Sequence, residues 1–184
     1  MKKKQHRTKT PKNSPKQKAI SIKHPPYNMD TPNNQVLFDT QNATIDVDLS
    51  KLEKLVRFIC EKFQCSDTMV HIGIVDDAGI IEVHHKFLQK DTTTDVISFD
   101  LTDEFGPEQT FQIIVNSEMA LRQAEKRHHS HEAELALYIT HGLLHNLGFD
   151  DILAEDAKKI HKTEDEILQA AGFGVVYHKQ ESID

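Results

Sequence analysis

The order of the apolar patterns along these 184 residues predicts a small mixed β-sheet with helices packed on it. Runs that alternate apolar and polar residues, or that are short and apolar, are typical of strands. Apolar residues three and four apart are typical of helices. The chain reads strand, helix, strand, helix, strand, strand and then three helices, which favours helices layered on one sheet. Strand order and direction stay open at this point.

The elements follow from periodicity and from the residues that begin and end helices. We expect strands at 44–47, 69–75, 96–99 and 111–115, and helices at about 50–63, 79–88, 116–126, 130–147 and 154–171. Ser50 and Glu53 fit a capping box at the start of the first helix. Gly148 and Gly172 stand where a glycine ends a helix.

The amino-terminal stretch has a different composition from the rest of the chain. Residues 1–42 are rich in Lys, Pro, Asn, Gln and Thr, which predicts a disordered basic arm before a folded domain at 43–184. Residues 1–24 hold nine of the 22 Lys and Arg residues and no acid, so 13 basic residues face 29 acidic ones in the remainder. The arm is either a solvated tail or a segment that touches phosphates without reading sequence.

Composition also narrows the class of protein. No apolar run approaches the roughly 18 to 20 residues that a membrane span needs. Met1 and the lysines after it are followed by no apolar signal region, so we expect a cytoplasmic protein. Cys60 and Cys65 are too few for a disulfide framework and predict reduced thiols, with Cys60 on a buried helix face.

The segment from His141 to Asp151 suggests chemistry. His141 and His145 lie four residues apart in a helical pattern and therefore point the same way. Beyond Gly148, Asp151 can turn back toward the imidazoles, with Asp150 and, one helix later, His161 as competing ligands. Two imidazoles and a carboxylate suit one zinc ion with a position left open for water. The alternative is that each histidine simply forms a hydrogen bond to a carboxylate or carbonyl group.

Position 142 and the remaining histidines limit what this site can be. Position 142 is Gly, where His-Glu-x-x-His peptidases carry their general base, so such a peptidase is disfavoured. The further histidines fall near predicted helix ends and in a charged linker, where we expect solvated side chains rather than metal ligands. They are His84, His85, His128, His129 and His131.

Three segments in order resemble those of the YbeY family of metal-dependent endoribonucleases. The segment from His141 to Asp151 is similar to His-Gly-x-Leu-His-Leu-x-Gly-Tyr-Asp-His, and 94–99 is similar to Thr-Asp-Val-Leu-Ser-Phe. Residues 111–124 are similar to the segment that ends in Ala-x-x-Gln-Ala. The resemblance covers about 44–171 and implies an α+β fold with the metal-binding helix at its centre.

The resemblance also implies a function and its site. It implies zinc on His141 and His145, and an endoribonuclease in ribosomal RNA maturation and ribosome quality control, with the small ribosomal subunit as partner. The third family ligand is His, and its position here is Asp151. Leu88 stands where the family usually has an arginine, so Lys90 or Lys86 would supply the charge for a phosphate.

Asp95 and Lys90 are the predicted catalytic residues. Asp95 lies in the segment with Thr94 and Ser98, which either lines the cleft or is simply the polar lead-in to a strand. Two alternatives to the nuclease remain. One is a ribosome-assembly factor without catalysis, whose metal site is structural or degenerate, and the other is a hydrolase of a substrate other than RNA.

Overall fold

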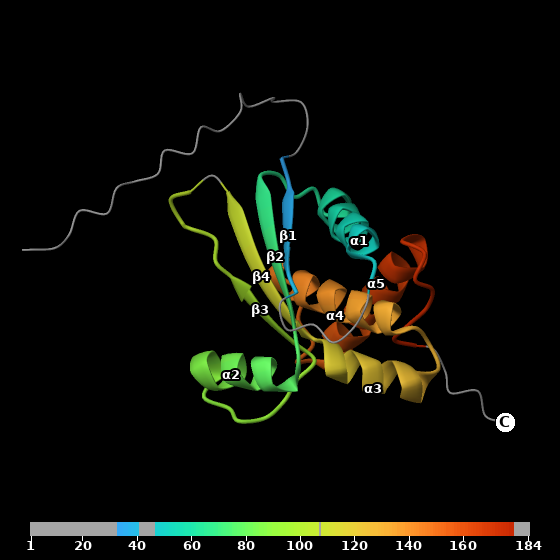
Figure 1. The fold of residues 1–184 in the computed structure, drawn as a ribbon. Coiled ribbons are helices and arrows are strands. Elements are labelled where there is room, and N and C mark those ends of the chain that lie inside the picture. The colour runs from blue at the N-terminus through green and yellow to red at the C-terminus, as the bar shows by residue number, and fades with distance from the viewer. Residues whose placement is uncertain (1–32, 41–46, 107, 179–184) are drawn as a thin grey trace, which may run out of the picture. The chain divides into compact units, whose positions relative to one another are not determined.

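The computed structural model describes residues 33–40, 47–106 and 108–178, which lie within one compact unit at Pro32–Asp184. The elements are β1 (Gln35–Asp39), α1 (Leu49–Lys62), β2 (Thr68–Val75), α2 (Asp77–Leu88), β3 (Val96–Asp100), β4 (Gln109–Asn116), α3 (Ser117–Arg127), α4 (His131–Asn146) and α5 (Ala154–Ala170). Figure 1 shows the sheet with most of the helices on one side.

The four strands form one mixed sheet in the order β1-β2-β4-β3. β1, β2 and β4 run parallel, and β3 runs antiparallel to β4 with Val96 opposite Val115. The fold is therefore α+β, and the predicted small mixed sheet is confirmed. The parallel pairs are joined by helices, as a parallel connection requires.

β1 corrects the predicted start of the folded domain. It lies inside the stretch 1–42 and pairs with β2, so folded structure begins before Ala43. The polar composition of residues 1–42 did not indicate this strand, because the strand is short and lies at the edge of the sheet. Only Val36 and Phe38 pack against the core. The strand expected at 44–47 lies outside the described residues except for Val47, which is not in a strand.

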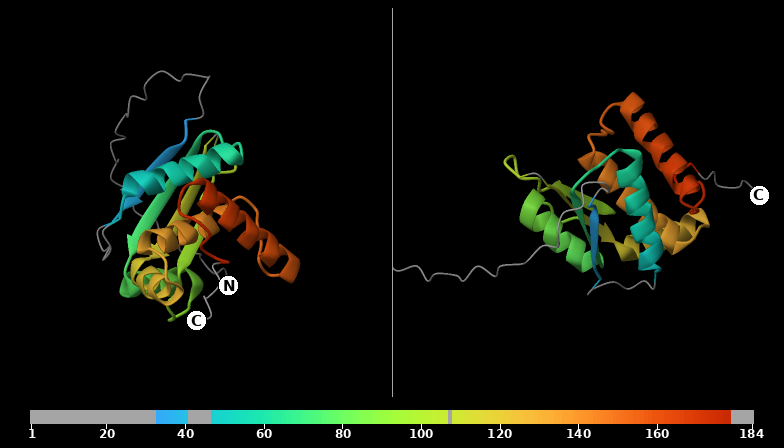
Figure 2. Two further views of the ribbon diagram at one scale, coloured as in Figure 1. Left: turned by 90° about the vertical axis from the view of Figure 1, so that its right-hand side faces the viewer. Right: turned by 90° about the horizontal axis from the view of Figure 1, so that it is seen from above.

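The sheet separates two layers. The buried side chains of β2 and β4, Val70, Ile72 and Ile74 with Phe111, Ile113 and Val115, belong to one continuous core with α1, α4 and α5. This alternation is the period of two that a strand imposes. α2 covers the other face, as the view from above in Figure 2 shows.

α4 is the central helix. Most of its residues are buried, because it lies between the sheet and helices α1, α3 and α5. Gly142 allows this close approach: a Cβ there would lie 3.0 Å from side-chain carbons of Ile113 and of Val96. A larger residue at 142 would therefore push α4 away from β3 and β4.

Both helix ends that were predicted from a glycine are confirmed, whereas α2 begins at Asp77 rather than at Gly79. Gly148 and Gly172 have positive φ angles of 87° and 84° just after α4 and α5. The capping box is wrong, because the N-cap of α1 is Asp48, two residues before Ser50, and its carboxylate accepts from the amides of Ser50 and Lys51. Glu53 pairs with an arginine on the same helix instead.

Both cysteines are buried free thiols, as predicted. Burial and the neighbouring Cys65 thiol raise the pKa of Cys60 to about 12, so this thiol is inert near neutral pH.

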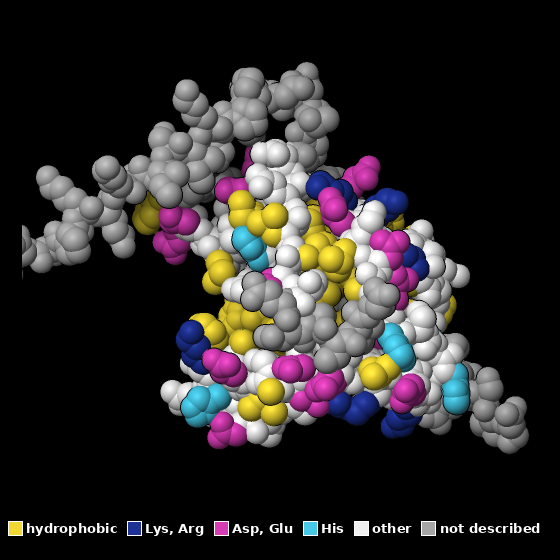
Figure 3. All heavy atoms as spheres, viewed as in Figure 1, with side chains coloured by type: hydrophobic (Ala, Val, Ile, Leu, Met, Phe, Trp, Pro, Cys, Tyr) yellow, Lys and Arg dark blue, Asp and Glu magenta, His cyan; other side chains and the backbone are white. Residues whose placement is uncertain are grey.

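The surface agrees with the charge division in the sequence. On the face drawn in Figure 3, acidic side chains are spread over the helices, while Lys and Arg lie in small separate groups. Among the described residues, no helix is long and apolar enough to cross a membrane.

Candidate metal centre

α4 places two imidazoles side by side at its carboxyl end. The Nε2 atoms of His141 and His145 lie 2.9 Å apart, and the two side chains are 21% and 30% exposed. The helix is held in the core on its other side by Leu143 and Leu144, which are fully buried. The predicted pair is therefore formed, and its open side faces solvent.

The turn at Gly148 brings the third group back to the pair. The Oδ2 atom of Asp151 lies 3.8 Å from the Nε2 atoms of both histidines. Asp150 instead accepts from the backbone amides of Asp151 and the next residue, which shapes the loop. The structure thus brings Asp151, rather than Asp150, into the cluster.

The far nitrogens of the two rings have acceptors of their own. Nδ1 of His141 lies 2.6 Å from Oε1 of Glu164, and Nδ1 of His145 lies 3.0 Å from the carbonyl oxygen of Phe149. Both rings therefore carry their proton on Nδ1. The two Nε2 lone pairs then face each other and Asp151, which is unfavourable without a cation and suits a metal.

The separations also fit a metal. Four ligands around zinc at bonds of about 2.0–2.2 Å are separated by about 3.3 Å from one another. The measured separations of 2.9 and 3.8 Å lie on either side of that value. Small side-chain rotations would seat one ion on His141, His145 and Asp151, with a fourth position toward solvent.

Glu164 of α5 is a residue of the candidate site that the sequence did not point to. Its side chain is fully buried, and its Oε2 atom also lies 2.9 Å from Nδ1 of His161. Glu164 with His141 and His161 is a second group of possible metal ligands. We interpret it as a hydrogen-bonded group, since both contacts have hydrogen-bond lengths. The available signal was an acid within the apolar stripe of Ile160 and Ile167.

The charges around His141 favour a cation. Burial disfavours its imidazolium, but the hydrogen bond and charge of Glu164, with the charges of Asp95 and Asp151, outweigh this and raise its pKa. The same carboxylates attract a divalent ion. Protons therefore compete with a metal for this site as the pH falls.

A cavity of about 140 Å³ opens beside His141. It is lined by Asp95, Met119, Gln123, Arg127, Glu134, Leu137, Tyr138, His141, His161, Glu164 and Tyr177. Asp95 holds its place because its Oδ1 atom accepts from the Thr94 hydroxyl and the Val96 amide. The structure thus brings Asp95 to the cavity that adjoins the cluster.

Lys90 is placed differently. It is exposed just after α2 and does not line this cavity. Leu88 is 48% exposed, and Lys86 lies over the ring of Phe87. Neither lysine would therefore contact a phosphate bound inside this cavity.

The histidines predicted to be solvated belong to no metal group within the described residues. Within the described parts of the chain, both groups that could hold a metal include His141. The expected solvation is wrong for His84, which is buried, and for His129, whose side chain is only 7% exposed. His84 is held by the carbonyl oxygen of Thr92, and His129 by the carboxylate of Glu134.

Two histidines and a carboxylate at the end of a buried helix, beside an open cavity, are the kind of ligand set that metal-dependent hydrolases use. A sequence model described as Endoribonuclease YbeY matches residues 37–172. The chain therefore belongs to the YbeY family. It is 37% identical over 144 residues to "Endoribonuclease YbeY" of Macrococcus caseolyticus, covering 73% of this chain and 94% of that one.

Other comparisons agree. The "Endoribonuclease YbeY" of Bacillus velezensis is 31% identical over 148 residues, covering 74% of this chain and 94% of the relative. The solution structure of TM1509 from Thermotoga maritima superposes with a TM-score of 0.51 at 24% identity, covering 74% of this chain and 90% of that one. That likeness supports the fold alone.

Proposed function

We propose that the protein is a zinc-dependent endoribonuclease that hydrolyses single-stranded RNA, with one zinc ion on His141, His145 and Asp151. The observation that carries this is the convergence of two Nε2 atoms and a carboxylate, while both Nδ1 atoms are held by acceptors. Neutral imidazoles and a carboxylate are zinc ligands, and a bound ion polarises a phosphodiester and lowers the pKa of water.

The chain's own residues complete the chemistry. The Oδ1 atom of Asp95 accepts from Thr94 and Val96, which fixes the carboxylate. The second carboxylate oxygen is left to accept a hydrogen bond from the attacking water. Lys90 is exposed, and we propose that it neutralises a phosphate of the substrate as a point charge. Gly142 leaves α4 without a general base, so proton transfer falls to residues outside that helix.

The biological substrate we propose is ribosomal RNA. The family name, the resemblance and the basic arm support a cytoplasmic enzyme that matures the 3′ end of 16S ribosomal RNA and acts in ribosome quality control, with the small ribosomal subunit as partner. The folded unit is acidic, so RNA would be attracted by the metal and by the arm rather than by the acidic side chains on the face drawn in Figure 3.

The test is the loss of one ligand. His145→Ala should reduce the zinc content from about one ion per chain to well below that, and should abolish cleavage of single-stranded RNA. His71→Ala is the matched control, since His71 lies on the opposite face of the sheet. Full cleavage by a metal-free His145→Ala protein would exclude the proposal.

A second function has its own support. Leu88 and Asp151 both depart from the family pattern, as expected of a ribosome-assembly factor in which the metal is structural. Such a protein would keep its zinc and bind ribosomal particles, yet cleave no RNA. Measuring both properties on the same zinc-loaded sample separates the two functions.

A further inference from the structure

His161 of α5 is an imidazole with one nitrogen held and the other available. Its Nδ1 atom lies 2.9 Å from Oε2 of Glu164, and its side chain is 18% exposed. Among the described residues, no hydrogen-bond partner is found for its Nε2 atom. His161 lines the cavity beside His141, and the two ring centroids are 6.2 Å apart.

Two contacts fix the orientation of this ring. Glu164, which is fully buried, accepts from Nδ1 and so keeps the proton there. The ring of Tyr177 stacks on the other side, with centroids 3.5 Å apart and planes at 10°. The Nε2 atom is therefore an unprotonated acceptor held in one place, as a positioned base requires.

The other two imidazoles of the candidate site are already engaged. His141 and His145 use both ring nitrogens, and Gly142 has no side chain. Glu134 is fully buried and paired with His129 and Arg127. His161 is thus the cavity imidazole that has a lone pair for a proton and lies outside the metal cluster.

We propose that His161 is the residue that accepts the proton of the attacking water in the proposed hydrolysis of RNA. The water oxygen forms a new bond to phosphorus, and its proton passes to Nε2 of His161. The bond from phosphorus to the leaving ribose oxygen breaks, and that oxygen takes a proton from solvent. His161 then returns its proton to solvent, so one water is consumed. Asp95, across the cavity, orients the water.

Two substitutions separate proton transfer from structure. In His161→Asn the amide nitrogen takes the place of Nδ1 and keeps the bond to Glu164, while Nε2 is lost. In His161→Gln the amide nitrogen takes the place of Nε2 but is not basic. Both variants should lower the rate of RNA cleavage by about 100-fold or more. Zinc content and affinity for RNA should stay within about twofold of the wild type.

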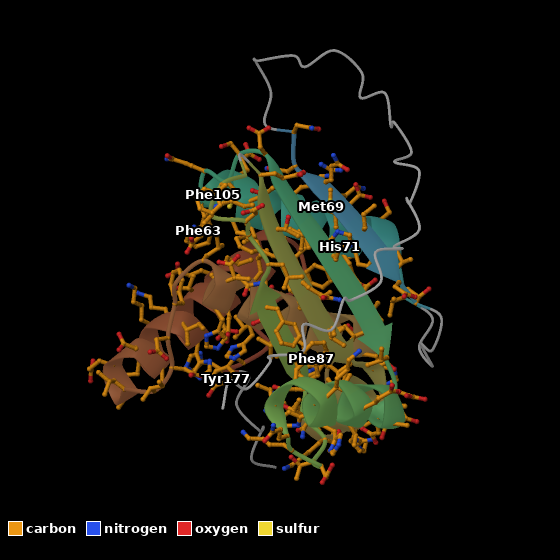
Figure 4. All side chains as sticks on the ribbon, turned by 90° about the vertical axis from the view of Figure 1, so that its left-hand side faces the viewer. Phe63, Met69, His71, Phe87, Phe105 and Tyr177 are labelled. Atoms are coloured by element: carbon orange, nitrogen blue, oxygen red, sulfur yellow. The ribbon has the colours of Figure 1, made fainter. Side chains whose placement is uncertain are left out.

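Two further readouts complete the experiment. Added imidazole should restore part of the activity of zinc-loaded His161→Gly, because the ligand fits between Tyr177 and Glu164, and should not accelerate the wild type. Long-range ¹H–¹⁵N spectra of the zinc-loaded wild type should show His161 with its proton on Nδ1. His71→Asn, on the other face of the sheet in Figure 4, is the control.

The outcomes are distinguishable. A zinc-loaded His161→Asn protein that cleaves RNA at more than half the wild-type rate would overturn the role of His161 and leave the proposed function intact. A proton on Nε2 of His161 would overturn the role as well. Zinc-loaded wild type that cleaves no RNA would overturn the proposed function and this role together.

Discussion

Glu164→Gln is the substitution that tests the metal centre most directly. The buried carboxylate of Glu164 accepts from His141 and His161 at once, at 2.6 and 2.9 Å. A glutamine amide has one acceptor oxygen, so its NH₂ group must face one of the two rings. If it faces His141, the proton of that ring moves to Nε2, the atom that should bind the metal.

The expected loss of zinc affinity follows because one acceptor oxygen cannot serve both rings. Removing a partner that orients a metal-binding histidine costs about 10- to 100-fold in metal affinity, or about 1.4 to 2.7 kcal/mol. We expect the lower end if the amide turns its oxygen toward His141 and the upper end if it does not. Competition with a chromophoric chelator measures the zinc dissociation constant.

A neighbouring carboxylate provides the control. Glu166 lies on the same helix, and its side chain is 56% exposed, with Oε1 at 3.8 Å from Nζ of Lys162. Glu166→Gln should therefore leave zinc affinity unchanged. Folding of each variant is checked by circular dichroism. A folded Glu164→Gln protein that binds zinc within twofold of the wild type would refute the role of this residue.

Two further predictions concern stability. Gly142→Ala should destabilise the fold by about 1–3 kcal/mol, because its Cβ would press on Ile113 and Val96; urea unfolding measures this, and an unchanged midpoint would contradict the close approach. The hydrogen-bonded guanidinium of Arg122 lowers the pKa of Asp77 to about 2. This pair therefore stabilises the fold above about pH 4 and loses its effect as the pH falls toward 2. Because both side chains are partly exposed, we expect about 1 kcal/mol, and Asp77→Asn should remove that part of the pH dependence between pH 5 and pH 2.

Local signals predicted most of the elements. Helix α4 was found from its apolar residues, and its end from Gly148, because a glycine with positive φ commonly follows a helix. Where two residues could each cap the same helix, the prediction selected the wrong one. Ser50 and Asp48 both suit the start of α1, and Asp48 caps it because its backbone and carboxylate both reach the first amides.

β1 and the buried histidines show the limit of local reasoning. β1 has five residues in a polar stretch, and its pairing with β2 depends on a neighbour more than 30 residues away. His84 and His129 looked like surface residues in sequence. Their burial depends on acceptors supplied elsewhere, by the backbone at Thr92 and by Glu134.

The sequence by itself determined the pair of imidazoles, since a spacing of four on a helix leaves them no other arrangement. It also indicated the turn after Gly148 that returns Asp151. The tertiary structure places Asp151, the expected third ligand, beside the imidazoles, and only the tertiary structure joined α5 to α4 through Glu164. The reason is physical: helix geometry fixes contacts between near neighbours, whereas contacts between helices depend on how the core packs.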